Sequence, residues 1–257
     1  MKAFILAAGQ GTRLRPYTDD RPKCMVPLAG RPLLHYQLDV LRSAGIEDIT
    51  VIGGYRADQL DTKGAPVVIN QRYALTNMVA TLFCATDRML GGADVLISYG
   101  DIVFEPRVLA KVLETPGELV VAADLDWQQL WRARMADPLS DAETFRMTDG
   151  NRIVELGKRA HDYRQIEAQY IGLIRVPGER VSRLVEAYRS IDQTAQFDGN
   201  DFDNMYMTRF VEYLIAVGWD VRAALIQNGW LELDTGADLE RYQALWHRGD
   251  LGKICNL

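Results

Sequence analysis

Two glycines and two cations follow directly after the first apolar segment of the chain. The run from Lys2 to Ala7 is followed by Gly9, Gly11 and Arg13, and Lys23 comes shortly after. Glycine removes side chains where backbone N–H groups must face a ligand, while arginine and lysine can neutralise phosphate charge. This pattern predicts a backbone cradle for the phosphates of a nucleotide.

Three competing motifs could account for the two glycines, and two of them fail. A dinucleotide fingerprint requires a third glycine, but Leu14 occupies its position. The G-x-x-x-x-G-K-[ST] string of P-loop kinases is absent. An ordinary glycine turn with two exposed cations would show the same short motif, so that alternative stays open.

Two distant aspartates each follow an apolar segment. Asp101 follows the run Asp94 to Ser98, and Asp234 follows Trp230 to Leu233. Ligands bind beyond the carboxyl ends of strands in open α/β sheets, so both carboxylates are expected at the rim above the first loop. Two carboxylates and a polyphosphate suit Mg²⁺, which we predict as the cofactor with Asp101 and Asp234 as its protein ligands. Two aspartates that merely cap loops are the alternative.

The elements that must position these groups alternate between strands and helices. Apolar strands are expected at Lys2 to Ala7, Asp48 to Ile52, Asp94 to Ser98 and Leu119 to Ala123, with a helix starting at Pro32. Such alternation predicts one three-layer α/β domain with a mixed, mainly parallel central sheet.

Helix caps and turns place further residues. Thr76 or Asn77 can cap a helix at the edge of the site, and Asp203 or Asn204 can cap another near the C-terminus. Asp149-Gly150 predicts a hairpin turn. The mixed aromatic and cationic stretch from Trp127 to Arg134 is expected to be an inserted, substrate-facing element.

Composition excludes several classes of function. The 257 residues are 48% hydrophobic and carry a net charge of -6, which argues against broad nucleic-acid or anionic-membrane binding. No apolar run approaches the roughly 18 residues of a membrane span, so we expect a cytoplasmic protein without a membrane partner. Three widely separated cysteines indicate neither disulfides nor a zinc site. The three histidines are expected to be surface or packing residues.

The stretch Leu6 to Leu14, followed by Arg21-Pro22-Lys23, closely resembles the signature of nucleotidylyltransferases that activate phosphorylated small molecules with an NTP. Over nearly the whole chain the likeness is to a cytidylyltransferase branch that handles phosphocholine, aminoethylphosphonate or phosphoglutamine. The matching stretches are Tyr73 to Ala85, Ser98 to Val103, Ile166 to Gly172, Asn204 to Thr208 and Trp230 to Thr235. The phosphoglutamine members are the most similar in the Trp127 to Arg134 and Asp137 to Thr144 regions.

This resemblance implies a Rossmann-like nucleotidyltransferase fold with a nucleotide half (1–123) and an acceptor half (124–257). It implies Mg²⁺-dependent transfer of CMP from CTP to a phosphorylated or phosphonate small molecule, with release of pyrophosphate. Such reactions serve cell-surface polysaccharide modification or phosphonate metabolism.

Residue by residue, the resemblance implies that Gly9, Gly11 and Arg13 surround the triphosphate, and that Lys23 contacts the transferred phosphate. Lys158 would be a second cation near the acceptor phosphate. The catalytic residues would be Lys23, Arg13 and Lys158. The nucleotide-binding residues would be Leu6, Ala7, Ala8, Gly9, Gly11, Thr12, Arg13, Lys23, Gly53, Thr76, Asn77, Gly100 and Asp101.

The expected acceptor site combines aromatic and acidic side chains. Together they could hold an ammonium group by cation–π contact and ion pairing, although aromatic residues more often belong to a core. The expected substrate-binding residues are Trp131, Lys158, Glu167, Tyr170, Asp203, Tyr206 and Trp230.

The reaction needs charge control more than proton transfer, because an ionised phosphate or phosphonate needs no general base to attack an α-phosphorus. Two alternatives stay open: a sugar-1-phosphate nucleotidylyltransferase that uses another NTP, and a non-catalytic module that senses nucleotides. The oligomeric state also stays open, with a homodimer among the options.

Overall fold

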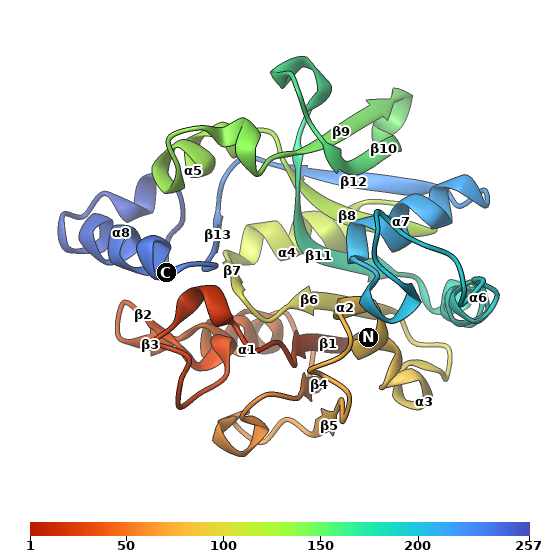
Figure 1. Cartoon of the computed structure of the whole chain (residues 1–257), viewed down its shortest axis with the longest axis horizontal. Coiled ribbons are helices and arrows are strands. Elements are labelled where there is room, and N and C mark those ends of the chain that lie inside the picture. Colours follow the sequence, from red (N-terminus) through yellow and green to blue (C-terminus); the bar gives the residue numbers. More distant parts are fainter.

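A nine-stranded mixed sheet runs through the molecule in the order β5-β4-β1-β6-β11-β8-β12-β10-β9. The computed structural model describes residues 1–257. In Figure 1 the N-terminal strands lie below the C-terminal ones, and the two groups meet where β6 pairs with β11. The strands are β1 (Lys2–Ala7), β4 (Asp48–Gly53), β5 (Val67–Ile69), β6 (Val95–Tyr99), β8 (Leu119–Asp124), β9 (Glu143–Thr148), β10 (Arg152–Arg159), β11 (Gln169–Val176) and β12 (Val221–Ile226).

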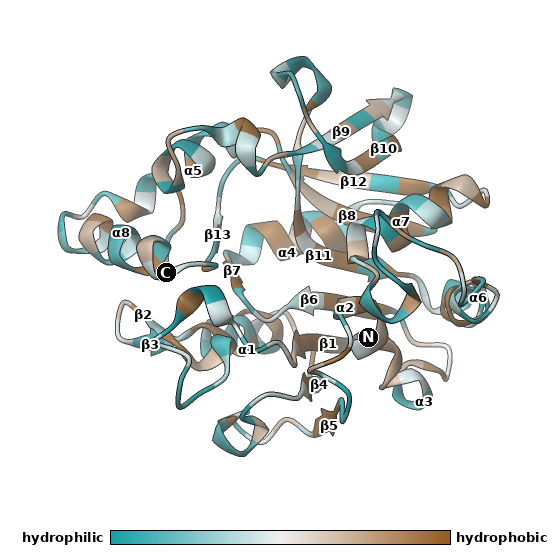
Figure 2. Cartoon of the chain, in the orientation of Figure 1, coloured by the Kyte–Doolittle hydropathy of each residue, from teal (hydrophilic) through white to brown (hydrophobic).

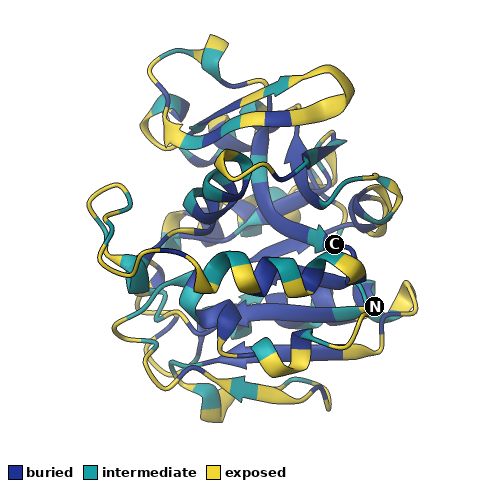
Figure 3. Cartoon of the chain, turned by 90° about the vertical axis from the view of Figure 1, so that its right-hand side faces the viewer, coloured by how far each residue is buried: buried dark blue, intermediate teal, exposed yellow.

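Helices cover both faces of this sheet, which makes three layers. One core contains α1 (Leu33–Ser43), α4 (Pro106–Glu114), α5 (Trp127–Arg134) and α8 (Gly236–His247). The other contains α2 (Met78–Phe83), α3 (Thr86–Met89), α6 (Gly178–Arg189) and α7 (Met207–Ala216). Figure 3 shows the buried strands between these outer layers, whose exposed surfaces face solvent.

Strand β1 supplies side chains to both cores. Ala3, Ile5 and Ala7 pack on one face, whereas Phe4 and Leu6 pack on the other. A continuous apolar strand is required here because neither face of the strand meets water. Its parallel neighbours β4 and β6 complete the expected central position, and Figure 2 shows the hydrophobic character of these strands. The predicted three-layer, mixed sheet is therefore confirmed.

The caps agree with the sequence in one place and differ in another. Asn77 occupies the N-cap of α2 and accepts a hydrogen bond from the Met78 amide, as its position predicted. Helix α2 ends at Phe83, and a break at Ala85 separates it from the short helix α3. The expectation that Asp203 or Asn204 caps α7 is wrong, because Tyr206 precedes that helix. Asp203 and Asn204 lie in a separate 3₁₀ turn, Phe202–Asn204.

A second, two-stranded ladder joins parts of the chain that lie far apart in sequence. Strand β13 (Trp230–Glu232) pairs with β7 (Ile102–Phe104) in antiparallel register, outside the main sheet. The Leu233 amide donates a hydrogen bond to the Asp101 carbonyl at 2.9 Å. This ladder places Asp101 and Asp234, each beside a strand end, close to one another. A smaller ladder joins β2 (Pro27–Leu28) and β3 (Arg31–Pro32).

In the region after β8, the stretch expected to be an inserted element forms helix α5, and the expected hairpin follows. Strands β9 and β10 pair around the turn Asp149–Asn151, in which Gly150 has a positive φ of 70°. The predicted hairpin is thus confirmed, and it forms one edge of the sheet. None of the helices is long and apolar enough to span a bilayer.

Candidate active site

The loop after β1 is held in place by one buried side chain and one hydroxyl. Leu14, at the end of the 3₁₀ turn Thr12–Leu14, is fully buried. The Thr18 hydroxyl donates a hydrogen bond to the Gly11 carbonyl at 2.9 Å. Gly11 itself has a φ of 59°, a left-handed conformation that costs other residues energy. The polar part of the loop is therefore fixed while its backbone stays accessible.

The two glycines of this loop differ in what requires them. A Cβ on Gly11 would lie 3.1 Å from the Lys23 Cβ, so the fold itself demands glycine there. A Cβ on Gly9 would meet no protein atom within 4 Å, and its φ is not positive. Since packing does not explain Gly9, the space beside it is available to a ligand that approaches the backbone.

Four charged residues form a chain of ion pairs, which we call the bridging cluster: Arg13, Lys23, Asp101 and Asp234. Lys23 Nζ lies 2.8 Å from Asp101 Oδ2 and 2.8 Å from Asp234 Oδ1. Arg13 Nη1 lies 2.8 Å from Asp234 Oδ2. The Lys23 side chain is 15% exposed and that of Arg13 is 70% exposed, so the cluster runs from the interior to the surface.

The opposite charges of the cluster stabilise one another's ionised forms. Burial alone would lower the pKa of Lys23, but the Asp101 and Asp234 carboxylates outweigh it and raise that pKa. Burial would raise the pKa of Asp234, yet Lys23 and Arg13 lower it overall. Lys23 and Asp234 therefore stay ionised at neutral pH, which suits a site that handles phosphate charge.

Two further residues hold the aspartates in place from behind. The Gln37 amide on α1 donates hydrogen bonds to the carbonyls of Tyr99 and Ile102, on both sides of Asp101. The Asp238 carboxylate accepts a hydrogen bond from the Asp234 amide and contacts the buried guanidinium of Arg134. Both carboxylates of the cluster thus sit on braced backbone.

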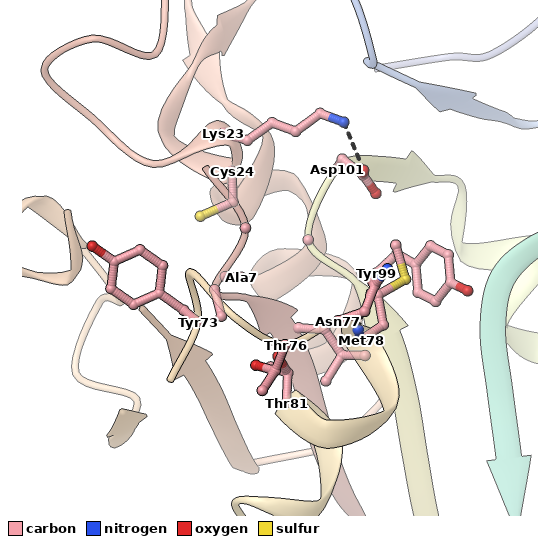
Figure 4. A pocket seen from close by; sticks show the side chains of 14 residues that line it. Ala7, Lys23, Cys24, Tyr73, Thr76, Asn77, Met78, Thr81, Tyr99 and Asp101 are labelled. Atoms are coloured by element: carbon pink, nitrogen blue, oxygen red, sulfur yellow. Dashed lines mark hydrogen bonds and ion pairs between the residues drawn. The ribbon is translucent and has the colours of Figure 1, made fainter. Parts of the chain in front are cut away.

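A first cavity lies between the carboxyl ends of β1 and β6 and the start of α2, as Figure 4 shows. Tyr73 and Tyr99 stand on opposite sides of it, and Lys23 points across its upper side to Asp101. It is lined by Leu6, Ala7, Ala8, Gly9, Lys23, Cys24, Tyr73, Thr76, Asn77, Met78, Thr81, Tyr99, Gly100 and Asp101.

Most of the residues expected around the nucleotide meet in this cavity. Leu6, Ala7, Ala8, Gly9, Lys23, Thr76, Asn77, Gly100 and Asp101 all line it. Gly11, Thr12, Arg13 and Gly53 do not. A Cβ on Gly53 would lie 2.8 Å from the Leu60 side chain and 3.4 Å from that of Val67 on β5, so a packing constraint accounts for that glycine.

A second cavity, of about 220 Å³, opens on the other side of the cluster. Tyr99 and Met78 line both cavities, while Arg13 and Asp234 line only the second. Its remaining lining residues are Trp131, Asp141, Glu143, Gln169, Tyr170, Ile171, Gly172, Tyr206, Met207, Thr208, Trp230 and Glu232. Of the expected acceptor residues, the structure brings together Trp131, Tyr170, Tyr206 and Trp230.

Three expected acceptor residues lie outside both cavities. Lys158 is 47% exposed and pairs with Glu155 and Glu212 on β10 and α7. The Glu167 carboxylate accepts a hydrogen bond from the Met147 amide, and Asp203 pairs with Arg72. Each of these side chains is thus engaged with a partner outside the second cavity.

Sequence reasoning missed several lining residues. Tyr73, Thr81 and Tyr99 lie within or beside the stretches that resemble the nucleotidylyltransferases, so their neighbourhood was a usable signal. The buried amide of Asn70 donates hydrogen bonds to both the Thr76 and the Thr81 hydroxyls, which fixes that wall. Asp141, Glu143 and Glu232 also lie within stretches that resemble these enzymes, Asp137 to Thr144 and Trp230 to Thr235, but only the tertiary fold shows that they line one cavity.

The cluster meets the requirements of a magnesium site. One oxygen of Asp101, Oδ1, is buried and has no hydrogen-bond partner. No three or more acidic, histidine or cysteine side chains are arranged so that they could hold a metal ion together, but Mg²⁺ typically uses one or two carboxylates together with phosphates and water. Asp101 and Asp234 therefore fit the ion as a pair.

Residues 3–160 match the model of the MobA-like NTP transferase domain. The chain is 43% identical over 249 residues to the CTP:phosphoglutamine cytidylyltransferase of Campylobacter jejuni, covering 93% of this chain and 98% of that protein. A 93-residue stretch, 35% of this chain and 41% of the relative, is 42% identical to the choline-phosphate cytidylyltransferase of Streptococcus pneumoniae.

Solved structures share the fold. The inositol-1-phosphate CTP transferase from T. maritima superposes with a TM-score of 0.73 at 21% identity, covering 100% of this chain and 98% of that one. At this identity the likeness concerns the architecture alone.

Proposed function

Because the chain belongs to the MobA-like NTP transferase family, we propose that it transfers CMP from CTP to a phosphorylated or phosphonate small molecule and releases pyrophosphate. The extended similarity to a CTP:phosphoglutamine cytidylyltransferase favours CTP as the donor and a phosphoglutamine-like acceptor. Shorter similarity to a choline-phosphate cytidylyltransferase supports an acceptor of this class.

One observation carries the proposal: the bridging cluster lies between two cavities. Lys23 and Asp101 line the first, Arg13 and Asp234 line the second, and Lys23 Nζ touches both carboxylates at 2.8 Å. A group transfer between two small molecules needs two adjacent sites with charge control at their junction. This arrangement supports the proposal that the nucleotide binds in the first cavity and the acceptor in the second.

In the proposed reaction, an ionised oxygen of the acceptor phosphate attacks the α-phosphorus of CTP. A new P–O bond forms, the bond between the α-phosphorus and the bridging oxygen breaks, and the electron pair leaves with pyrophosphate. No proton has to be removed from the nucleophile. The residues of the site therefore act by positioning and by offsetting negative charge.

The cations of the cluster have different parts in this scheme. Lys23 is nearly buried and points between the cavities, which suits a contact with the α-phosphate. Arg13 is exposed beside the backbone of the loop and suits the leaving pyrophosphate. To reach phosphate, both must exchange at least one carboxylate partner for a ligand oxygen. A divalent cation bound by Asp101 and Asp234 would then compensate the negative charge of these two carboxylates.

We propose Mg²⁺ as that cation, held by Asp101 and Asp234. When bound, it would supply Lewis-acid stabilisation of phosphate charge. The unpaired Asp101 Oδ1 supports the assignment. Asp101→Asn and Asp234→Asn are expected to keep CTP binding while abolishing Mg²⁺-dependent turnover, and calorimetry with CTP separates the two effects.

A screen for pyrophosphate release tests the function directly. CTP, UTP, dTTP and GTP are each combined with phosphoglutamine, phosphocholine, 2-aminoethylphosphonate and glucose-1-phosphate. We expect turnover with CTP and with at least one of the first three acceptors. Preference for the sugar phosphate with another NTP would make the chain a sugar-1-phosphate nucleotidylyltransferase. Nucleotide binding without turnover across the whole screen would point to a sensing module.

A further inference from the structure

The second cavity contains an unusual number of acidic groups. Asp141, Glu143, Glu232 and Asp234 all line it. Three of them have partners within the protein. Asp234 pairs with Arg13 and Lys23, Glu232 pairs with Arg134 at 2.7 Å, and Asp141 accepts a hydrogen bond from the Trp131 indole at 3.0 Å.

Glu143 is the exception. Its main chain is fixed, because the Gln169 side chain accepts a hydrogen bond from the Glu143 amide and donates one to the Glu143 carbonyl. Its carboxylate, in contrast, has no hydrogen bond and no ion pair with any residue, and it faces the cavity. Arg209 acts on it electrostatically, but that guanidinium is already paired with Asp198 and Glu212.

The surroundings of Glu143 disfavour a bare negative charge. Burial, followed by repulsion from Asp141 and Glu232, raises the pKa of this carboxyl to about 7. The charged and titratable groups that face it are Asp141, Asp198, Arg209 and Glu232, together with the phenols of Tyr99 and Tyr170. An incoming cation would relieve this repulsion.

The rest of the cavity wall suits an organic cation. The Trp131 and Trp230 indoles are almost fully buried, and their N–H groups are held by Asp141 and Asp124. Aromatic surfaces attract ammonium groups through the electrostatics of their rings. The buried hydroxyl of Tyr170 has no hydrogen-bond partner and lies in the same wall. The cavity thus offers a free carboxylate, aromatic rings and an unpaired hydroxyl.

We propose that Glu143 is the specificity-determining residue of the acceptor cavity and binds an ammonium group of the acceptor. This proposal rests on the proposed function, since it assigns one end of the acceptor while the bridging cluster receives its phosphate. Glu167 and Asp203, the acidic residues that the sequence suggested for this contact, lie outside the cavity.

A matched pair of acceptors isolates the cationic group. O-phosphoethanolamine and propyl phosphate have similar size and the same phosphate, but only the first carries an ammonium. Phosphoglutamine and its des-amino analogue form a second pair. The wild-type kcat/KM should favour the amine by on the order of 10- to 100-fold, because a site built for a polar contact rejects the analogue without it.

Glu143→Gln should reduce this preference to below about 3-fold while the KM for CTP stays unchanged. Glu143→Asp keeps the charge and should retain part of the preference. Glu155→Gln, in the same hairpin but paired with Lys158 outside both cavities, is the matched control. A full preference in Glu143→Gln, or no preference in the wild type, would overturn the proposal.

The pH profile gives a second readout. Because the pKa of Glu143 is about 7, this carboxyl becomes charged as the pH rises through that value, and the KM for the amine should fall relative to that for its partner. The shared phosphate cancels from this ratio. In Glu143→Gln the ratio should be flat, whereas an unchanged slope would assign the effect to another group.

A measurement of acceptor binding alone distinguishes a failure of the proposed function from a failure of the proposal for Glu143. If no acceptor releases pyrophosphate from CTP, the proposed function fails, but calorimetry with O-phosphoethanolamine and propyl phosphate still tests Glu143. Tighter binding of the amine that is lost in Glu143→Gln supports the assignment. Equal binding of both compounds rejects it.

Discussion

The two cavities on either side of the bridging cluster are built in different ways. The first is lined by a few short segments, residues 6–9, 23–24, 73–81 and 99–101. The second is lined by residues from α5, β9, β11, α7, β13 and the loops beside them, among which only 169–172 and 206–208 are continuous runs. Backbone that ends a strand can bind phosphate with a short motif. A small acceptor is instead recognised by side chains that only the fold gathers.

The two cavities also differ in how their charges are compensated. In the first, Lys23 lies between two carboxylates that keep it charged. In the second, Glu143 has no partner at all. The difference indicates that the charged groups for the transfer step are already paired before a ligand binds. The carboxylate that selects the acceptor, in contrast, is free to pair with the ligand. Substitutions on each side test this contrast.

The largest effect is expected at the junction. Lys23→Ala should lower kcat for pyrophosphate release by on the order of 10²-fold or more, because it removes the cation that offsets charge at the α-phosphorus. Lys63→Ala, which breaks an exposed pair with Asp61, is the control and should turn over normally. If kcat fell by less than about 3-fold in Lys23→Ala, Lys23 would have no catalytic role.

The second-largest effect is expected at Arg134, which contacts Asp238 behind the bridging cluster. Arg134→Met should cost about 3–5 kcal/mol of unfolding free energy, because it leaves Asp238 and Glu232 without their buried partner. Urea denaturation measures the loss. Arg132→Met on the same helix removes an exposed guanidinium and should change stability by less than about 0.5 kcal/mol. Similar losses of unfolding free energy in both variants would show that the ion pairs of Arg134 do not stabilise the fold.

The two loop glycines should respond in opposite ways. Gly9→Ala should leave stability within about 0.5 kcal/mol but raise the KM for CTP about tenfold, since only a ligand needs its space. Gly11→Ala should destabilise the fold by about 1–2 kcal/mol because of its positive φ. Thermal melts and CTP titrations separate them. An unchanged KM for CTP in Gly9→Ala would show that the nucleotide does not contact the loop backbone at Gly9.

The smallest effect is expected at Lys158. Its ammonium pairs with two carboxylates at the surface and lines neither cavity, so Lys158→Ala should change kcat/KM by less than about 3-fold. A steady-state assay with the best acceptor decides this. A drop near that of Lys23→Ala would restore the role that family resemblance suggested and extend the acceptor site to β10.

Much of the first cavity could be predicted from the sequence, because its determinants are local. Continuous apolar runs predicted β1 and β6, and the positions of Gly9 and Asp101 follow from where these strands end. Residue type narrowed the cap of α2 to Thr76 or Asn77, and the structure shows Asn77. Gly53 was assigned to the nucleotide by resemblance, although a packing contact with Leu60 accounts for it.

The order of residues along the chain predicted the three-layer fold, which the structure confirms. It also singled out the glycine loop and the four charged residues that the structure brings together in the cluster. The position of Lys23 between Asp101 and Asp234 depends on the tertiary structure, because the ladder of β7 and β13 brings together segments that are distant in sequence. The tertiary structure also replaced Glu167 and Asp203 by Glu143 in the acceptor cavity. The charge of a side chain follows from its residue type, but the partner that neutralises it, or the absence of one, depends on long-range packing.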